Sequence, residues 1–287
     1  MREYKIYTDS TCDLPNEIVT KYDITVVPTE VFLLSKGYLD FPDERELNKK
    51  EFFEAIQQGA TPTTAVIPPS RFYEYFERDI KEGYDILYIV FSSGLTTTKQ
   101  NATIALGDLS REYSNCNIVI VDSLSASLGE GFLVHYAAVQ KEAGKTIDEV
   151  KTLVENIRKK LYVWFTVDDL QQLKRGGRIS ATAAAVGGAL NIKPLIFIDD
   201  TGRLVPVERV RGRKAALDTI IGKVKVGAVN LSEQTVFLVH ANCAADCDYI
   251  KEQLYLLGAK EVISGMMGPV IGAHTGVGAI GLAYLGE

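Results

Sequence analysis

Three short runs of apolar residues, each followed by a longer helical pattern, constrain the fold of this chain more than any other feature. The runs are apolar on consecutive positions, which is typical of strands buried on both faces of a parallel sheet. The predicted strands are Tyr4–Thr8, Ile86–Phe91 and Asn117–Val121. The helices predicted after them are Asn16–Tyr22, Thr97–Tyr113 and Ser127–Ala143. Strands separated by helices indicate right-handed β-α-β units and a mostly parallel sheet.

The pattern changes near Gly144, where one helix ends on glycine and another, Ile147–Lys160, begins. We therefore expect a domain boundary there, with one domain spanning residues 1–145 and the other residues 146–287. Two more helices are expected in the first domain, at Phe52–Ile56 and Phe72–Ile80.

The second half of the chain contains a hairpin signal. Its predicted strands are Tyr162–Val167, Pro194–Ile198, Leu204–Arg211 and Thr235–Val239. The turn Asp199-Asp200-Thr201-Gly202 joins the second of these strands to the third, which requires antiparallel pairing. The predicted fold class is therefore α/β with two domains. The N-terminal domain has a mostly parallel sheet with flanking helices, and the C-terminal domain has a mixed or antiparallel sheet with helices.

Composition excludes several functional classes. Of the 287 residues, 46% are hydrophobic and 24% charged, which is ordinary for a globular protein with a sizeable core. The net charge of -6 argues against a general nucleic-acid binder or an anionic-membrane binder. The four cysteines are scattered, the first residues lack the apolar core of a signal peptide, and no apolar run is long enough to span a membrane. We expect a cytoplasmic protein without stable membrane insertion.

Positive charge is concentrated in one segment. Residues 174–225 contain 11 Lys and Arg against 4 Asp and Glu, a net +7. A local basic face on an acidic protein indicates an anionic ligand or an acidic protein partner. The alternative is that part of the excess lies on a solvated helix face.

Polar residues follow each of the three predicted parallel strands. The turns begin at Thr8-Asp9-Ser10-Thr11, at Ser92-Ser93-Gly94 and at Asp122-Ser123. The carboxyl ends of parallel strands lie together, so these hydroxyls and the following helix N-termini predict a group of donors for a carboxylate or phosphate. The alternative is that each side chain simply caps the next helix.

Two glycine-containing segments are further candidates. Residues 168–177 are predicted to form a capped helix that ends on Gly176-Gly177, and a helix of small residues, Ala181–Leu190, follows. Small side chains allow a slender ligand, or a second helix, to approach closely. Near the end of the chain His274 lies among glycines, where we expect exposed backbone and a hydrogen-bond donor for an anion.

Several motifs fail on inspection. Gly276–Gly281 matches the dinucleotide fingerprint, but too few residues follow it for the rest of that fold. His240, Cys243 and Cys247 have metal-like spacing without an evident fourth ligand. There is no Walker A pattern in the sequence. We expect neither a metal nor a cofactor.

A serine hydrolase is the alternative enzymatic interpretation. Ser93, Asp122 and His274 occur in the order used by the α/β-hydrolases. However, the nucleophile elbow needs glycine two positions before the serine, where this chain has Phe91.

Five sequence blocks together resemble the DegV family over nearly the whole chain. They are Asp9–Pro15, Thr63–Ala65, Ser92–Thr98, Leu173–Ile179 and Gly272–Gly278. The resemblance implies a two-domain α/β protein that buries one long-chain fatty acid between its domains. It also implies that some members present the acyl chain to a separate ATP-dependent fatty acid kinase, a step toward phospholipid metabolism.

The resemblance also implies roles for individual residues. Thr64 and Thr96 would hydrogen-bond the carboxylate with Ser93 nearby, His274 would line the head-group end, and Arg211 would lie on the basic surface where a kinase could dock. Ser10, Gly176 and Gly177 complete the expected ligand-binding residues, and no catalytic residue is expected.

Physical chemistry agrees with a binding role. Burial of each methylene contributes about 0.8 kcal/mol, so an acyl chain gains on the order of 10 kcal/mol before the entropy of association is subtracted. The carboxylate must be hydrogen-bonded, because burial of an unpaired ion is very unfavourable. Hydroxyl groups and His274 could meet that need without a base placed to activate a nucleophile. A variant of this interpretation is regulation by fatty-acid level without phosphoryl transfer.

Overall fold

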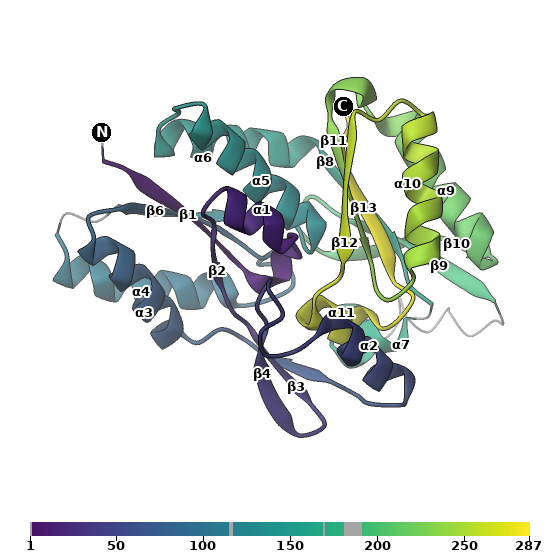
Figure 1. Ribbon diagram of the computed structural model, residues 1–287, viewed down its shortest axis with the longest axis horizontal. Coiled ribbons are helices and arrows are strands. Elements are labelled where there is room, and N and C mark those ends of the chain that lie inside the picture. Colours follow the sequence, from purple (N-terminus) through teal and green to yellow (C-terminus); the bar gives the residue numbers. More distant parts are fainter. Residues whose placement is uncertain (1, 115–116, 169, 181–190) are drawn as a thin grey trace.

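A parallel sheet forms the first half of the molecule, which we describe from a computed structural model of residues 2–114, 117–168, 170–180 and 191–287 (Figure 1). This sheet A has the strand order β2-β1-β6-β7 with every pair parallel. Its strands are β1 (Tyr4–Asp9), β2 (Thr25–Val27), β6 (Asp85–Val90) and β7 (Ile118–Asp122). The three strands predicted from consecutive apolar residues are confirmed.

Helices cover both faces of sheet A, as β-α-β connections require. They are α1 (Asn16–Lys21), α3 (Pro69–Lys81), α4 (Thr98–Glu112), α5 (Leu128–Glu142) and α6 (Ile147–Ile157). Phe72 and Phe76 of α3 pack with Tyr7 and Tyr88 of the sheet in an aromatic cluster on one face. Helix α5 contacts β1 and β6, and α6 contacts α5 and β7.

A small antiparallel sheet B projects from the first half of the chain (Figure 1). It has the order β4-β3-β5 and consists of β3 (Glu30–Leu33), β4 (Lys36–Leu39) and β5 (Thr63–Ala65). The sequence analysis did not predict it. Helix α2 (Lys49–Gln57) lies between β4 and β5 along the chain, and the Asn48 side chain caps its first turn.

Sheet C forms the second half of the molecule, in the order β10-β9-β8-β13-β11-β12. Its strands are β8 (Leu161–Thr166), β9 (Ile192–Ile198), β10 (Leu204–Arg211), β11 (Thr235–His240), β12 (Glu261–Met266) and β13 (Ile280–Leu285). Only β11 and β12 pair in parallel, so the predicted mixed sheet is confirmed. The predicted hairpin joins β9 to β10.

Short and long helices complete this half. They are α7 (Gln171–Arg175), α9 (Arg213–Gly227), α10 (Ala244–Leu256) and α11 (Pro269–Thr275), with 3-10 turns at Arg158–Lys160 and Leu231–Glu233. A further 3-10 turn, Ser10–Cys12, follows β1 in the first half. Helices α9 and α10 lie on the outer side of sheet C, where Leu217, Ile220 and Ile250 are fully or almost fully buried (Figure 1).

Helix α5 lies between the two large sheets. It contacts β1 and β6 of sheet A and also β8, β11 and β13 of sheet C. Phe132 of α5 packs edge-on against Phe237 of β11, and both belong to one continuous core that includes Ile6 and Leu87 of sheet A. A helix that is apolar on all sides is expected in such a place.

Two expectations need comment. His274 lies in helix α11 rather than on exposed backbone, because Pro269 begins a helical turn that continues to Thr275. The predicted helix Ala181–Leu190 lies outside the described residues. Among the residues that are described, no helix is long and apolar enough to cross a membrane.

Candidate functional site

A narrow, mostly apolar cavity lies where sheets A, B and C meet. Its apolar walls come from the turn after β6, the start of α5, the inner face of sheet C and helix α11. The lining side chains of this kind include Phe91, Leu95, Leu128, Val163, Phe165, Ile198, Leu204, Val239, Val270, Ile271 and Leu282. The empty space in the cavity and its mouth is about 920 Å³, but the centre of a water molecule fits in only about 90 Å³ of it. The cavity is therefore slender, a shape suited to a thin apolar ligand.

Thr64 and His274 form the centre of a polar cluster in this cavity. The Thr64 Oγ1 and His274 Nε2 atoms are 2.9 Å apart, although the two residues are 210 positions apart in the chain. Pairing of Thr64 with Val31 in sheet B fixes the hydroxyl, and helix α11 fixes the imidazole. The structure thus brings together two of the residues predicted for the head-group end.

The His274 imidazole is neutral at physiological pH. Burial, together with the nearby Arg178 guanidinium, lowers the pKa of His274 to about 4. Its Nδ1 atom is buried and has no hydrogen-bond partner among the described residues. A Cβ atom at Gly176 would lie 2.2 Å from that nitrogen, so only glycine at this position allows the ring to lie where it does.

Arg178 is a cavity residue that sequence reasoning missed. It is half-buried, its guanidinium donates to the Gly176 carbonyl, and burial lowers its pKa. The polar cluster predicted for the head group therefore contains a guanidinium as well as neutral donors. The available signal was an arginine directly after the Gly-Gly end of a helix, next to the apolar residue Ile179.

Thr96 and Thr98 supply a second pair of hydroxyls to the cavity lining. Their Oγ1 atoms are 2.9 Å apart, at the start of α4. Thr11, Thr29, Ser127 and Thr275 line the cavity as well. The described polar groups of the lining are thus mainly hydroxyls, with one imidazole and one guanidinium among them.

Other predicted site residues lie elsewhere. Ser93 lines an outer depression together with Lys99 and Gln100, and this depression shares Thr96 with the cavity lining. Ser10 is buried, and its hydroxyl accepts a hydrogen bond from the Thr29 N–H at 3.1 Å.

Two more of the predicted ligand-binding residues, Gly177 and Arg211, are exposed. Gly177 has a positive φ of 71° at the end of α7, and Arg211 is exposed at the end of β10. Neither lines the cavity. Gly176 acts through its contact with His274, as described above.

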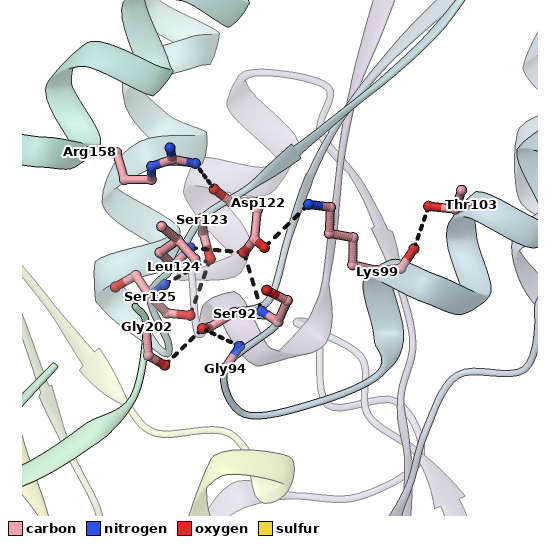
Figure 2. Close-up of polar contacts among 11 residues, drawn as sticks. Ser92, Gly94, Lys99, Thr103, Asp122, Ser123, Leu124, Ser125, Arg158 and Gly202 are labelled. Carbon is pink, nitrogen blue, oxygen red and sulfur yellow. Dashed lines mark hydrogen bonds and ion pairs between the residues drawn. The ribbon is translucent and has the colours of Figure 1, made fainter. Parts of the chain in front are cut away.

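The three residues of the hydrolase alternative do not form a triad. The Asp122 carboxylate accepts hydrogen bonds from the backbone N–H groups of Ser93 and Leu124 and from Lys99 (Figure 2). His274 is hydrogen-bonded to Thr64 instead. Because the carboxylate contacts neither the imidazole nor the serine hydroxyl in the described structure, the relay that activates a serine is absent.

The polar turns after β1, β6 and β7 do lie together, as predicted, but they largely satisfy one another. The Asp9 carboxylate accepts from the Phe91 N–H at 3.2 Å and from the Tyr88 hydroxyl at 2.9 Å. The Ser92 hydroxyl donates to the Gly202 carbonyl of sheet C at 2.8 Å (Figure 2). The two contacts of Asp9 lie within the first half, whereas the Ser92 contact links the first half to the turn between β9 and β10.

Two buried carboxylic acids support helix α11. Asp13 accepts from the Gly268 N–H at 2.8 Å and from the Ser127 hydroxyl, and burial raises its pKa to about 6. Burial and the neighbouring Asp13 raise the pKa of Asp40 to about 7, and its Oδ2 atom has no partner among the described residues. A residue of the first half therefore anchors the helix that carries His274.

Metal chemistry has no evident centre in this part of the chain. Within residues 2–114, 117–168, 170–180 and 191–287, no cluster of three or more His, Cys, Asp or Glu side chains could hold a metal ion. His240 accepts a hydrogen bond from the Cys243 N–H, which uses one of the nitrogens considered for zinc.

Comparisons with known proteins identify relatives along the whole chain. The model of the DegV family, described as uncharacterised proteins of that family, matches residues 3–287. A DegV domain-containing protein of Clostridium perfringens is 39% identical over 288 residues, which cover 100% of this chain and 99% of that protein.

Solved structures show the same fold. A fatty-acid-binding DegV family protein from Thermus thermophilus has a TM-score of 0.87 and 29% identity, and the match covers 99% of this chain and 100% of that one. DegV of Bacillus subtilis, a fatty acid binding protein, has a TM-score of 0.85 and 27% identity, with 100% of both chains covered.

Proposed function

This chain belongs to the DegV family, and from that membership and the shape of its cavity we propose that it binds one long-chain fatty acid. The observation that carries the proposal is a slender apolar cavity between the two halves of the molecule, with a hydroxyl, imidazole and guanidinium cluster in its lining. The fatty acids named for the solved relatives support the same ligand class.

The acyl chain lies against apolar side chains that come from both halves of the molecule. Leu95 belongs to the first half, whereas Phe165, Val239 and Ile271 belong to the second. Burial of methylene groups against such walls provides most of the favourable free energy, at about 0.8 kcal/mol for each group. A ligand bound there stabilises the contact between the two halves.

The carboxylate lies at Thr64, His274 and Arg178. When His274 carries its proton on Nε2, it donates to the Thr64 oxygen, and the Thr64 hydroxyl is then free to donate to the carboxylate. Arg178 supplies the compensating charge that a buried carboxylate needs. Thr96 is a further donor at the same cavity, as the family resemblance implies.

Binding rather than catalysis is the role that these residues support. The neutral imidazole contacts a threonine and the guanidinium contacts a backbone carbonyl, so neither group is paired with a carboxylate as in a catalytic relay. We propose that the protein needs no metal or cofactor for this role and that it works in the cytoplasm.

A fatty acid kinase is the proposed partner. Arg211 is exposed and, within the described residues, takes part in no ion pair, so its charge is available to an acidic surface. We expect Arg211→Glu to weaken capture of a bacterial fatty acid kinase at low salt, and fatty acid binding to stay the same. Regulation by fatty-acid level without phosphoryl transfer would instead leave no kinase to capture.

Native mass spectrometry of the protein expressed in bacteria tests the binding proposal. We expect an added mass equal to one common long-chain fatty acid. Loss of a hydrogen bond to a charged group weakens binding by roughly 1.5–3 kcal/mol, so Thr64→Val with His274→Ala should lower the affinity for hexadecanoic acid at least about tenfold.

Thr103→Val is the matched control, because this exposed hydroxyl of α4 donates to the Lys99 carbonyl and does not line the cavity (Figure 2). A wild-type protein that carries no lipid and ignores added hexadecanoic acid would contradict the proposed function. Equal affinity in the double variant and the control would contradict the head-group assignment.

A further inference from the structure

A second pocket adjoins the narrow apolar cavity that we propose for the acyl chain, called the acyl cavity below. Both lie between the two halves of the molecule. The second pocket is lined by the turn after β7, by the 3-10 turn before β8 and by the end of β9. Its empty space, about 870 Å³, is close to that of the acyl cavity, but about 380 Å³ of it is wide enough for the centre of a water molecule, so the second pocket is wider. Its polar lining includes Ser123, Ser125, Arg158 and Lys159.

The two spaces share a wall. Val163 of β8 and Ile198 of β9 line both the acyl cavity and the second pocket. Since Trp164 pairs with Phe197 in these antiparallel strands, Val163 and Ile198 face each other one position further on. Two neighbouring aliphatic side chains are therefore the boundary between the apolar space and the polar one.

This wall lies away from the carboxylate site. Strand β8 ends at Thr166 and is followed along the chain by α7, which contacts the helix α11 that carries His274, and Val163 lies three residues before the end of β8. Three residues of a strand span roughly 10 Å. An acyl chain held at Arg178 and His274 that follows β8 thus points its far end toward Val163, Ile198 and the second pocket.

Ser125 offers an unused hydroxyl at this wall. The residue is only 3% exposed, and its Oγ atom has no hydrogen-bond partner in the described part of the chain. The Oγ atom lies beside Gly129, a residue of the acyl cavity, where an added Cβ would be 2.2 Å from it and 2.7 Å from Val163. A buried hydroxyl without a partner is unfavourable unless a ligand or water satisfies it.

Arg158 adds a positive charge with unused donors. In the described structure its guanidinium donates to the Asp122 carbonyl and forms no ion pair (Figure 2). Of the two acids that line the pocket, Asp199 already accepts hydrogen bonds from Thr201 and Arg203 in its own turn, and Asp200 is exposed.

We propose that the second pocket receives the far end of the acyl chain and that the ligands of this protein include long-chain acids with an oxygenated terminus, either ω-hydroxy acids or α,ω-dicarboxylic acids. The proposal rests on the proposed function and specifies its ligand class. Ser125 bonds a terminal hydroxyl, and Arg158 pairs with a terminal carboxylate. A cavity closed by apolar side chains would instead reject an oxygenated end about 10- to 100-fold, because its oxygen would lose its hydrogen bonds to water.

Competition binding on the delipidated full chain tests this proposal. The ligands are hexadecanoic acid, ω-hydroxyhexadecanoic acid and the dioic acids from dodecane to octadecane, and the readout is the affinity of each relative to hexadecanoic acid. We expect the ω-hydroxy acid and at least one dioic acid to bind within about threefold of hexadecanoic acid.

Variants of the second pocket assign the contacts. Ser125→Ala should lower the relative affinity for the ω-hydroxy acid about tenfold, and Arg158→Gln should do the same for the best dioic acid. Arg111→Gln, on the exposed surface of α4, is the matched control and should change neither ratio.

Three outcomes are decisive. Binding of hexadecanoic acid with rejection of every oxygenated ligand by about tenfold or more would overturn this inference and leave the proposed function intact. The inference would also be overturned if neither Ser125→Ala nor Arg158→Gln changed the affinity of the oxygenated acids relative to hexadecanoic acid. Failure of hexadecanoic acid itself to bind would overturn the proposed function, and this inference with it.

Discussion

Gly176 lies so close to His274 that a methyl group added at position 176 would displace the imidazole. Gly176 has a negative φ of -70°, so alanine fits its backbone, but the new Cβ would lie 2.2 Å from the His274 Nδ1 atom. The His274 ring must therefore shift, which breaks its hydrogen bond to Thr64. We expect Gly176→Ala to weaken binding of hexadecanoic acid about tenfold, measured by isothermal titration calorimetry.

Gly222 in the middle of α9 provides the control for this prediction. An added Cβ there meets nothing within 4 Å, and alanine favours the helix by up to about 1 kcal/mol. Gly222→Ala should therefore raise thermal stability and leave binding unchanged. Wild-type affinity in Gly176→Ala would show that the position of His274 does not matter for the ligand.

Single residues also show what sequence reasoning could reach. Thr64 and His274 were selected from motifs, and the structure brings them within hydrogen-bonding distance. Arg178 was overlooked, because periodicity does not distinguish a half-buried arginine from a solvated one. Ser93 lines an outer depression that shares Thr96 with the cavity lining, and its backbone N–H donates to Asp122. Its assignment as a ligand-binding residue stays a prediction.

At the scale of elements, helix α11 depends on two acids of the first half of the chain. The pKa of Asp40 is raised from 3.8 to about 7, so the folded protein keeps a proton that the unfolded chain loses between about pH 4 and pH 7. Stability from this group is present at low pH and is lost as pH rises through about 7. The positive charge of Lys49 lowers the pKa of Asp40, and the negative charge of Asp13 raises it.

We therefore expect Asp40→Asn to be more stable than the wild type at pH 8, by on the order of 3 kcal/mol, and to lose this advantage near pH 4. Urea unfolding at a series of pH values measures the difference. Asp200→Asn, at an exposed position, is the control and should follow the wild type. A variant that is less stable than the wild type at pH 8 would show that Asp40 makes a favourable ionic contact.

The elements that sequence reasoning missed lack most of the residues that usually mark a turn or a helix. The turn between β3 and β4 has Leu34 and Ser35 at positive φ values of 49° and 65°, where hairpin signatures call for asparagine or glycine. Helix α11 lies in a glycine-rich stretch that favours a loop, and Pro269 at its first turn was the only start signal. The long strands and helices of sheet A were predicted because burial on both faces leaves continuous apolar runs.

At the scale of the whole molecule, helix α5 joins the two halves into one unit. The core is continuous across α5, and the Ser92–Gly202 hydrogen bond links the halves directly. We expect calorimetry to show one unfolding transition. Hexadecanoic acid at about 100 times its Kd should stabilise the folded state by about 2.7 kcal/mol and so raise the Tm by several degrees.

The Thr64→Val and His274→Ala double variant is the control for this shift and should move less at the same ligand concentration. Two separate transitions, with only one sensitive to ligand, would contradict a shared core.

The sequence could predict two sheets and their pairing type, but not that α5 contacts both, because an apolar surface does not specify its partner. The boundary between residues 145 and 146 stays a prediction, and α6, just beyond it, packs on α5 and β7 of the first half.

The place of β13 in sheet C has a consequence for how the protein is made. Residues 280–285 emerge from the ribosome after all other described strands, yet they pair with both β8 and β11 in the middle of the sheet. Until they arrive, the nascent polypeptide exposes two unpaired strand edges. Chaperone protection during synthesis should therefore matter most for this half, because the middle of sheet C is complete only after residues 280–285 have left the ribosome.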